Sequence, residues 1–301
     1  MQLYNDYNTY LRSKYGCKVY RIGLDAGFSC PNRDGTKGTG GCIYCNGEGS
    51  RSGYANPDHD IRKQLLDRID YLKKAKGASK FIAYFQAFTN TYAYPAALKK
   101  IYDRILDIDG VVGLSIGTRP DAIDEDKLKL IASYAKDIEV WLELGIQSIH
   151  NRTLERINRA HTFEDFIKAL ALAKKFDLPV SAHVILGLPG ETKDDMLETA
   201  KRLSGLKIDA VKIHLLHILK GSPLERSYSE GKVTLLTRAE YVEVVCDFLE
   251  YLSPAIIIQR LTGQGSRRDH IAPEWALDKL DTIGRITDTL KKRGSRQGFR
   301  S

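Results

Sequence analysis

The sequence of 301 residues contains no run of about 18 apolar residues, so no segment has the composition of a membrane-spanning helix. The first sixteen residues lack the apolar stretch of a secretory signal, and we therefore expect a cytoplasmic protein with no membrane partner. Methionine and tryptophan occur only twice each, and internal repeats and low-complexity linkers are absent. With 43% hydrophobic and 28% charged residues, the composition is typical of a folded protein and argues against long disorder.

Cysteine is also scarce, with five residues at Cys17, Cys30, Cys42, Cys45 and Cys246. An odd number of cysteines without a secretory signal does not suggest a disulfide framework. Three of the five lie between Cys30 and Cys45, a grouping that indicates a metal or redox site. The other two, Cys17 and Cys246, are expected to be buried as small apolar side chains.

Positive charge exceeds negative charge, with 46 Lys and Arg against 38 Asp and Glu. The excess concentrates in residues 260–301, where ten Lys or Arg face five Asp or Glu. A basic end indicates a polyanionic partner, RNA above all, and a solvated tail that only aids solubility is the alternative.

Short runs rich in Val, Ile, Leu and Phe alternate with segments whose apolar residues recur at helical spacing. The runs predict strands at residues 18–24, 80–86, 111–116, 139–147, 179–186, 210–216 and 255–259. Between them we expect helices at 58–76, 95–107, 124–136, 162–176, 192–206 and 237–251. Thr162, Thr192 and Thr237 are the expected N-caps of three of these helices. Repeated strand–helix–strand units predict a parallel sheet, either open or curled into a barrel, with functional sites at the carboxyl ends of the strands.

The loop after the first strand carries the three grouped cysteines in the spacing C-x11-C-x2-C. Thiolates are ligands for iron–sulfur clusters and for zinc. A structural zinc site needs a fourth protein ligand, and the nearest histidine, His59, stands at the start of a predicted helix. Three thiolates suit a [4Fe–4S] cluster with one open iron, so we favour a cluster over zinc or a chance grouping.

The block GFSCPNRDGTKGTGGCIYC resembles the cysteine loop of radical S-adenosylmethionine (SAM) enzymes, in particular the YhcC/YtqA type and the radical SAM part of the Elongator catalytic subunit. The eleven residues between Cys30 and Cys42 depart from the usual C-x3-C-x2-C spacing of the superfamily, and a long first gap is a feature of these relatives. Tyr44 stands at the usual aromatic position. HVILGLPGET, at residues 183–192, resembles a second family motif, and the resemblance covers nearly the whole chain.

This resemblance implies an α/β fold: a partial (β/α)6 TIM-like barrel over residues 1–255, including an N-terminal helix and the cluster loop. Residues 256–301 would form a basic strand and helix extension packed on the barrel. It also implies two cofactors, a [4Fe–4S] cluster on Cys30, Cys42 and Cys45, and SAM. The implied SAM contacts are Tyr44, Gln86, Thr89, Asn90, Arg119, Gln147, Ser148, Arg159, Ile185, Gly187, Leu188 and Pro189.

Several of these residues also have ordinary structural interpretations. Arg119 can hold Asp121 or Asp124 instead of a SAM carboxylate, and Gly187 to Gly190 fits a simple strand-to-helix turn. His214 is expected to be a satisfied core residue, whereas His183 starts its motif and has no assigned task. The N-terminal tyrosines, including Tyr7 and Tyr10, are expected either to stack on nucleic-acid bases or to pack a helix on the barrel.

The Elongator-like resemblance implies reductive cleavage of SAM to a 5′-deoxyadenosyl radical and chemistry on tRNA at the C5 substituent of the wobble uridine. It suggests conversion of a carboxymethylaminomethyl group to an aminomethyl group, with a downstream methyltransferase as a further partner. A one-electron donor of the flavodoxin or ferredoxin type is also implied. Because the chain leaves no room for an acetyltransferase domain, acetyl transfer is not expected. The alternatives are radical chemistry on a small molecule and a non-enzymatic metal-containing RNA-binding protein.

Overall fold

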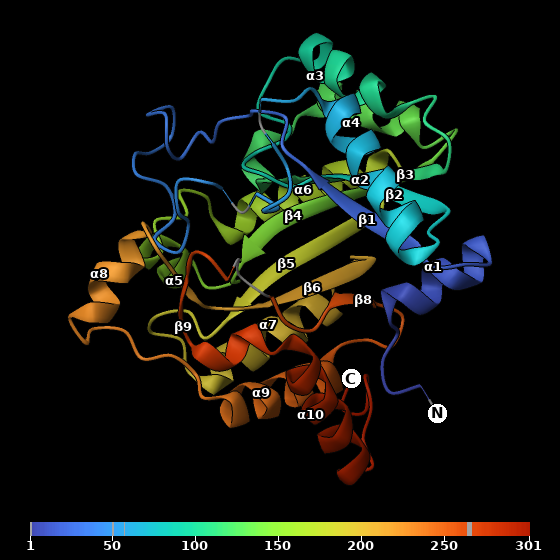
Figure 1. The fold of residues 1–301 in the computed structure, drawn as a ribbon. Helices are drawn as coiled ribbons and strands as arrows, with labels where there is room; N and C mark the ends of the chain where they lie inside the picture. The colour runs from blue at the N-terminus through green and yellow to red at the C-terminus, as the bar shows by residue number, and fades with distance from the viewer. Residues whose placement is uncertain (1, 50, 57, 264–266) are drawn as a thin grey trace.

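The computed structural model describes residues 2–49, 51–56, 58–263 and 267–301. Its centre is a curled sheet of seven strands, all of whose neighbouring pairs are parallel, in the order β1-β2-β3-β4-β5-β6-β8 (Figure 1). The strands are β1 (Val19–Leu24), β2 (Lys80–Phe85), β3 (Val111–Thr118), β4 (Glu139–Gln147), β5 (Val180–Leu186), β6 (Ala210–Leu215) and β8 (Ile257–Arg260). Two short strands, β7 (Ile218–Leu219) and β9 (His270–Ala272), pair separately and antiparallel.

Most of the helices cover the outside of the sheet (Figure 1). They are α1 (Tyr7–Tyr15), α2 (Ile61–Lys76), α3 (Pro95–Tyr102), α4 (Glu125–Tyr134), α5 (Asn151–Arg156), α6 (Phe163–Lys175), α7 (Lys193–Ser204), α8 (Pro223–Ser229), α9 (Arg238–Tyr251) and α10 (Lys279–Lys292). All six helices expected from apolar spacing are present, although the segment 95–107 divides into α3 and a 3-10 turn at Asp103–Ile105.

The expected partial barrel is confirmed, and the segment beyond residue 255 adds to it. β8 extends the sheet as its seventh strand by pairing with β6, while α10 packs on α9. The division of the chain at residue 255 stays a prediction. Arg293 is bonded to Asp247 at 2.7 Å and to Glu250 at 3.0 Å, so acidic side chains of α9 offset part of the basic charge of this end. Among the described residues, no helix is both long and apolar enough to cross a membrane.

Side chains alternate along the strands between an apolar outer face and a polar inner face. In β4, Val140, Leu142 and Leu144 join the main core with the helices. Glu143 and Gln147, at the alternate positions, line a cavity on the inner face. The sheet therefore keeps one face for packing and the concave face for polar side chains.

Helix α1 closes the amino end of the half-barrel. Tyr7 and Leu11 are buried against Trp141 and Ile82 on the inner face of the sheet. The rings of Tyr7 and Trp141 meet edge to face with centroids 5.6 Å apart. Of the two expectations for the N-terminal tyrosines, packing of a helix on the barrel is therefore confirmed for Tyr7.

The three predicted N-caps are confirmed, and each forms a full capping box. Thr237 accepts a hydrogen bond from the backbone N–H of Glu240 at 3.3 Å, and Glu240 accepts one from the N–H of Thr237 at 2.8 Å. We expect Thr237→Ala to lower the free energy of unfolding by about 1 kcal/mol, because it leaves an N–H of the first turn of α9 without its partner. Urea denaturation measures this loss. Thr237→Ser keeps the acceptor and Thr234→Ala lies outside the helix, so a similar loss in either would contradict the assignment.

Candidate functional site

A cavity opens on the inner face of the sheet. It is bounded by the cysteine loop, which extends from the tip of β1 (Figure 1), and by side chains of several strands. The structure brings together ten of the predicted site residues in its wall: Cys30, Cys42, Tyr44, Cys45, Gln86, Thr89, Arg119, Gln147, Arg159 and Ile185. The parallel topology explains this convergence, because the carboxyl ends of parallel strands meet at one edge of the sheet.

Two donors approach the sulfur atom of Cys42, the most buried of the three grouped cysteines. Asn32 Nδ2 lies 3.6 Å from Cys42 Sγ, and Arg159 Nη1 lies 3.4 Å from it. Burial alone would raise the pKa of the Cys42 thiol, but the Arg159 cation, the hydrogen bonds from Arg159 and Tyr44, and the Arg119 cation together hold this pKa below its usual value. The surroundings of Cys42 therefore favour the thiolate, which is the form that binds metals.

The distances between the three sulfur atoms bear on the metal centre that they can hold. Among the described residues, one group of three potential metal-binding side chains has ligand atoms that all lie within 4.8 Å of one another. That group does not include the three cysteines. Ligands on one tetrahedral zinc ion, with Zn–S bonds of about 2.3 Å, would lie only about 3.8 Å apart. Cys30, Cys42 and Cys45 are therefore not gathered as closely as the ligands of a single zinc ion.

Hydrogen bonds fix the Arg159 side chain and also determine the protonation state of His161. Its Nη2 donates to the carbonyl oxygen of Gly145 at 2.7 Å, and its Nε donates to His161 Nε2 at 2.9 Å. Gly145 permits this approach, because a Cβ there would lie 2.7 Å from Arg159 Nη2. His161 Nε2 accepts and therefore carries no proton. Consistently, burial and the neighbouring arginines lower the pKa of His161 to about 3.

Arg119 pairs with Asp121, one of the two aspartates that the sequence offers as its partner. Its guanidinium binds Asp121 through two hydrogen bonds of 2.9 and 3.0 Å. Its Nη1 is buried without a partner among the described residues. The bidentate face of Arg119 is thus occupied, and only Nη1 is left for a ligand in the cavity.

Five predicted contacts lie outside the cavity wall: Asn90, Ser148, Gly187, Leu188 and Pro189. Asn90 Nδ2 donates to the carbonyl oxygens of Phe85 at 3.1 Å and Gly117 at 2.8 Å, which ties the ends of β2 and β3 together. Ser148 donates to Glu191. Gly187 has a φ of 83°, as a tight turn after β5 requires. In this structure these residues support the wall, and their direct contact with SAM stays a prediction.

A buried ionic cluster at the inner part of the cavity was not predicted. Glu143 of β4 binds Arg21 of β1, and its Oε2 also receives Lys212 of β6 at 2.8 Å and His183 at 2.7 Å. Although burial acts to raise the pKa of Glu143, the cations of Arg21 and Lys212 lower it well below its usual value. The isolated Glu in WLELG and Lys in VKIHL are the signals that could have found this cluster.

The expectation that His214 is a satisfied core residue is wrong. His214 lines the cavity, and its Nε2 is buried without a partner among the described residues. Its ring centroid lies 5.3 Å from that of His183, which also lines the cavity. Both histidines belong to the site because inner-face positions of β5 and β6 point into the barrel.

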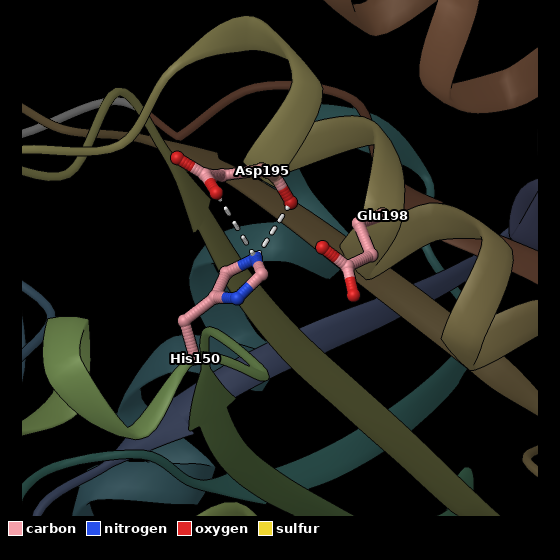
Figure 2. Close-up of side chains that lie close together, drawn as sticks. All are labelled: His150, Asp195 and Glu198. Carbon is pink, nitrogen blue, oxygen red and sulfur yellow. Dashed lines mark hydrogen bonds and ion pairs between the residues drawn. The ribbon is translucent and has the colours of Figure 1, made fainter.

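The one group of close ligand atoms consists, among the described residues, of His150, which precedes α5, and of Asp195 and Glu198 on α7 (Figure 2). His150 Nε2 lies 3.0 Å from the backbone carbonyl of Asp195, which can only accept, so this nitrogen carries the proton and cannot bind a metal. The Asp195 carboxylate accepts a hydrogen bond of 2.8 Å from the backbone N–H of Thr192 and forms an ion pair with Arg152. The Asp195 carboxylate is therefore already engaged in capping α7 and in an ion pair.

Comparison with known proteins agrees with this geometry. Residues 34–203 match the model of the Radical SAM superfamily, and residues 208–292 match the Radical SAM C-terminal domain. The chain belongs to the radical SAM superfamily. It is therefore an enzyme, and the alternative of a non-enzymatic binding protein is wrong.

This radical SAM enzyme is 41% identical to YtqA of Bacillus subtilis (strain 168), over 98% of the chain and 92% of that protein. It is 33% identical to the tRNA uridine(34) acetyltransferase of Methanocaldococcus jannaschii over 137 residues, which are 44% of the chain and 25% of that protein. The structure of Methanocaldococcus infernus Elp3 superposes with a TM-score of 0.71 and 20% identity, over 93% of the chain and 64% of Elp3. The predicted kinship with the YhcC/YtqA type and the Elongator radical SAM fold is confirmed.

The cofactors of this radical SAM enzyme are those of its superfamily, a [4Fe–4S] cluster and SAM. The donor set of the cavity fits both. Three thiols face it, and the polar side chains of Gln86, Thr89 and Gln147 line it from successive strands. When bound, the two cofactors together supply a 5′-deoxyadenosyl radical.

Proposed function

We propose that this enzyme holds its [4Fe–4S] cluster through Cys30, Cys42 and Cys45 and modifies tRNA at the C5 substituent of the wobble uridine. The observation that carries the proposal is the cysteine loop, whose three thiols open on one cavity with a buried polar wall. The kinship with a tRNA uridine(34) acetyltransferase supports tRNA as the substrate and uridine 34 as its target.

In this proposal the cavity residues orient SAM beside the cluster. Gln86, Thr89 and Gln147 offer hydrogen bonds, and Arg119 Nη1 offers a buried donor that has no protein partner among the described residues. Tyr44 and Ile185 supply apolar surface. Arg159 acts through the Cys42 sulfur and is a positioning residue. Asn90, Ser148, Gly187, Leu188 and Pro189 shape the wall behind them.

The proposed reaction converts a carboxymethylaminomethyl group to an aminomethyl group. The bond between nitrogen and the carboxymethyl carbon breaks, and water supplies the oxygen of the departing two-carbon aldehyde acid. This cleavage of the substituent releases two electrons and two protons. The two electrons and one of the protons are those that convert SAM to methionine and 5′-deoxyadenosine, and the other proton is released. A flavodoxin- or ferredoxin-type donor would supply the initiating electron, and a methyltransferase would act next. We place these partners in the cytoplasm.

The test is 5′-deoxyadenosine formation by anaerobically reconstituted protein with SAM and dithionite. We expect bulk tRNA to stimulate the product at least about tenfold at low salt and to lose this effect as salt rises, because phosphate contacts release counter-ions. Ribonuclease-treated tRNA is the matched control. Equal product with and without tRNA at every salt concentration would favour a small-molecule substrate. No product from protein with a verified cluster would contradict the proposal.

A further inference from the structure

The deep part of the cavity has more positive charge than its protein groups neutralise. Lys212 and Arg260 line it, Arg21 lies beside them, and Glu143 is the one carboxylate among the described residues of the wall. Lys212 and Arg260 are register partners in the adjacent strands β6 and β8. The curl of the sheet also brings its two edges together, since Arg21 Nη1 of β1 donates to Gln259 Oε1 of β8 at 3.2 Å.

Glu143 cannot serve as the counter-ion for all of these cations. One of its oxygens binds Arg21, and the other receives both Lys212 and His183. Lys212 is further fixed by a hydrogen bond of 2.9 Å to the hydroxyl of Tyr84. These five groups bond to one another and position Lys212, and none of the bonds named here involves Arg260.

Arg260 is the cation that this arrangement leaves available. Its guanidinium has no hydrogen bond or ion pair to any described residue, although it lines the cavity. Burial, and also the nearby Arg21 cation, lower the pKa of Arg260, although Tyr84 and Glu143 act to raise it. An arginine side chain nonetheless stays protonated in proteins, so the site calls for an anion.

A second unpaired group lies on the strand next to Arg260. His214, on β6 two positions after Lys212, lines the same cavity and has a buried Nε2 without a partner in the described part of the chain. The residue opposite its ring is Gly263, where a Cβ would lie 3.2 Å from His214 Nδ1. The chain after β8 thus leaves room for the imidazole beside Arg260.

We propose that Arg260, with His214 beside it, binds a carboxylate carried by the substrate in the deep part of the cavity. This inference rests on the proposed function and identifies the end of the uridine substituent that the enzyme recognises. The planar fork of arginine matches a carboxylate through two parallel hydrogen bonds.

The enclosure of Arg260 favours a substituent over the RNA backbone. Arg260 lies on the inner face of the barrel, in a cavity whose wall also contains the cysteine loop. A backbone phosphate stays on the outside of a folded RNA, whereas a base turned out of its stack can carry its substituent into a pocket. The carboxylate that reaches Arg260 is therefore that of the modified base.

The test compares binding of three anticodon stem-loop RNAs to the cluster-loaded full chain without SAM or reductant. The RNAs carry 5-carboxymethylaminomethyluridine, 5-aminomethyluridine or uridine, and fluorescence anisotropy gives each Kd. We expect the carboxylate-bearing RNA to bind at least about tenfold more tightly than the aminomethyl one, the effect of one charge-assisted contact. Arg260→Met should abolish this preference, Arg260→Lys should retain part of it, and His214→Gln should reduce it about threefold.

Arg285→Met is the matched control, because Arg285 is an exposed cation of α10 with 59% of its side chain accessible. It should leave the preference unchanged. Equal binding of the three RNAs by the wild type, or a full preference in folded Arg260→Met and Arg260→Lys variants, would overturn the inference. tRNA-stimulated 5′-deoxyadenosine formation without any carboxylate preference would refute this inference alone. Absence of that product from loaded enzyme would instead refute the proposed function, whatever the binding result.

Discussion

Alanine at Cys42 is expected to reduce 5′-deoxyadenosine formation by more than about a thousandfold, to the level of protein without a cluster. The same loss is expected for Cys30→Ala and Cys45→Ala, because each variant keeps only two of the three thiolates proposed to hold the cluster. Iron and acid-labile sulfide after anaerobic reconstitution give the cluster content, and chromatography of the reaction gives the product. The cluster content and the amount of 5′-deoxyadenosine should fall together.

Cys17→Ala is the control for this series. Cys17 is half-buried outside the cavity, with its sulfur 3.7 Å from the hydroxyl of Ser79, so its removal should leave cluster content and product unchanged. Full product from any one of the three loop variants would show that the remaining thiols suffice and would contradict the assignment.

The variant Glu143→Gln is expected to lower the free energy of unfolding by about 3–5 kcal/mol, since it leaves the buried Arg21 and Lys212 cations without their shared anion. A loss of this size corresponds to a decrease in Tm of about 5–10 °C for a domain of this length. Calorimetry on preparations with equal cluster content measures it. Because the pKa of Glu143 is held well below its usual value, its contribution is present at neutral pH and disappears only in acid.

A double-mutant cycle with Lys212→Met separates the ionic cluster from simple loss of packing. Removal of one cation should offset part of the cost of Glu143→Gln, so the double variant should be more stable than the sum of the two single changes predicts. Strict additivity, or a loss below about 1 kcal/mol for Glu143→Gln alone, would show that the cations find other compensation.

Local sequence patterns predicted the framework well. Strand β4 is predicted with its observed bounds, and the other six strands of the large sheet are predicted within two residues of theirs at either end, whereas β7 and β9 are not predicted. Thr162, Thr192 and Thr237 were recognised as N-caps because a capping box depends only on residues three apart. The grouping of the cysteines in the first strand loop likewise followed from spacing and topology, both of which are local or regular.

Long-range partnerships were not predictable in the same way. Arg21 and Glu143 are separated by 122 positions, and Lys212 and Glu143 by 69, so only the curvature of the sheet brings them together. The run around Glu143 reads as a buried strand, and one carboxylate within it does not reveal its partners. The failure at His214 has a related cause, because the alternation in β6 places Lys212 and His214 on one face but does not show that this face lines a cavity.

The junction between the two ends of the described chain has a consequence for synthesis on the ribosome. The carbonyl of Asn5 accepts from Ile258 at 2.7 Å, and the backbone N–H of Asn5 donates to Gln297 at 2.8 Å. The segment that precedes α1 therefore cannot pair until some 250 further residues have been synthesised. Translation of that length takes roughly 10–50 s. Until then the nascent half-barrel has an uncovered edge at β6, and a chaperone that shields this edge would be needed most during those seconds.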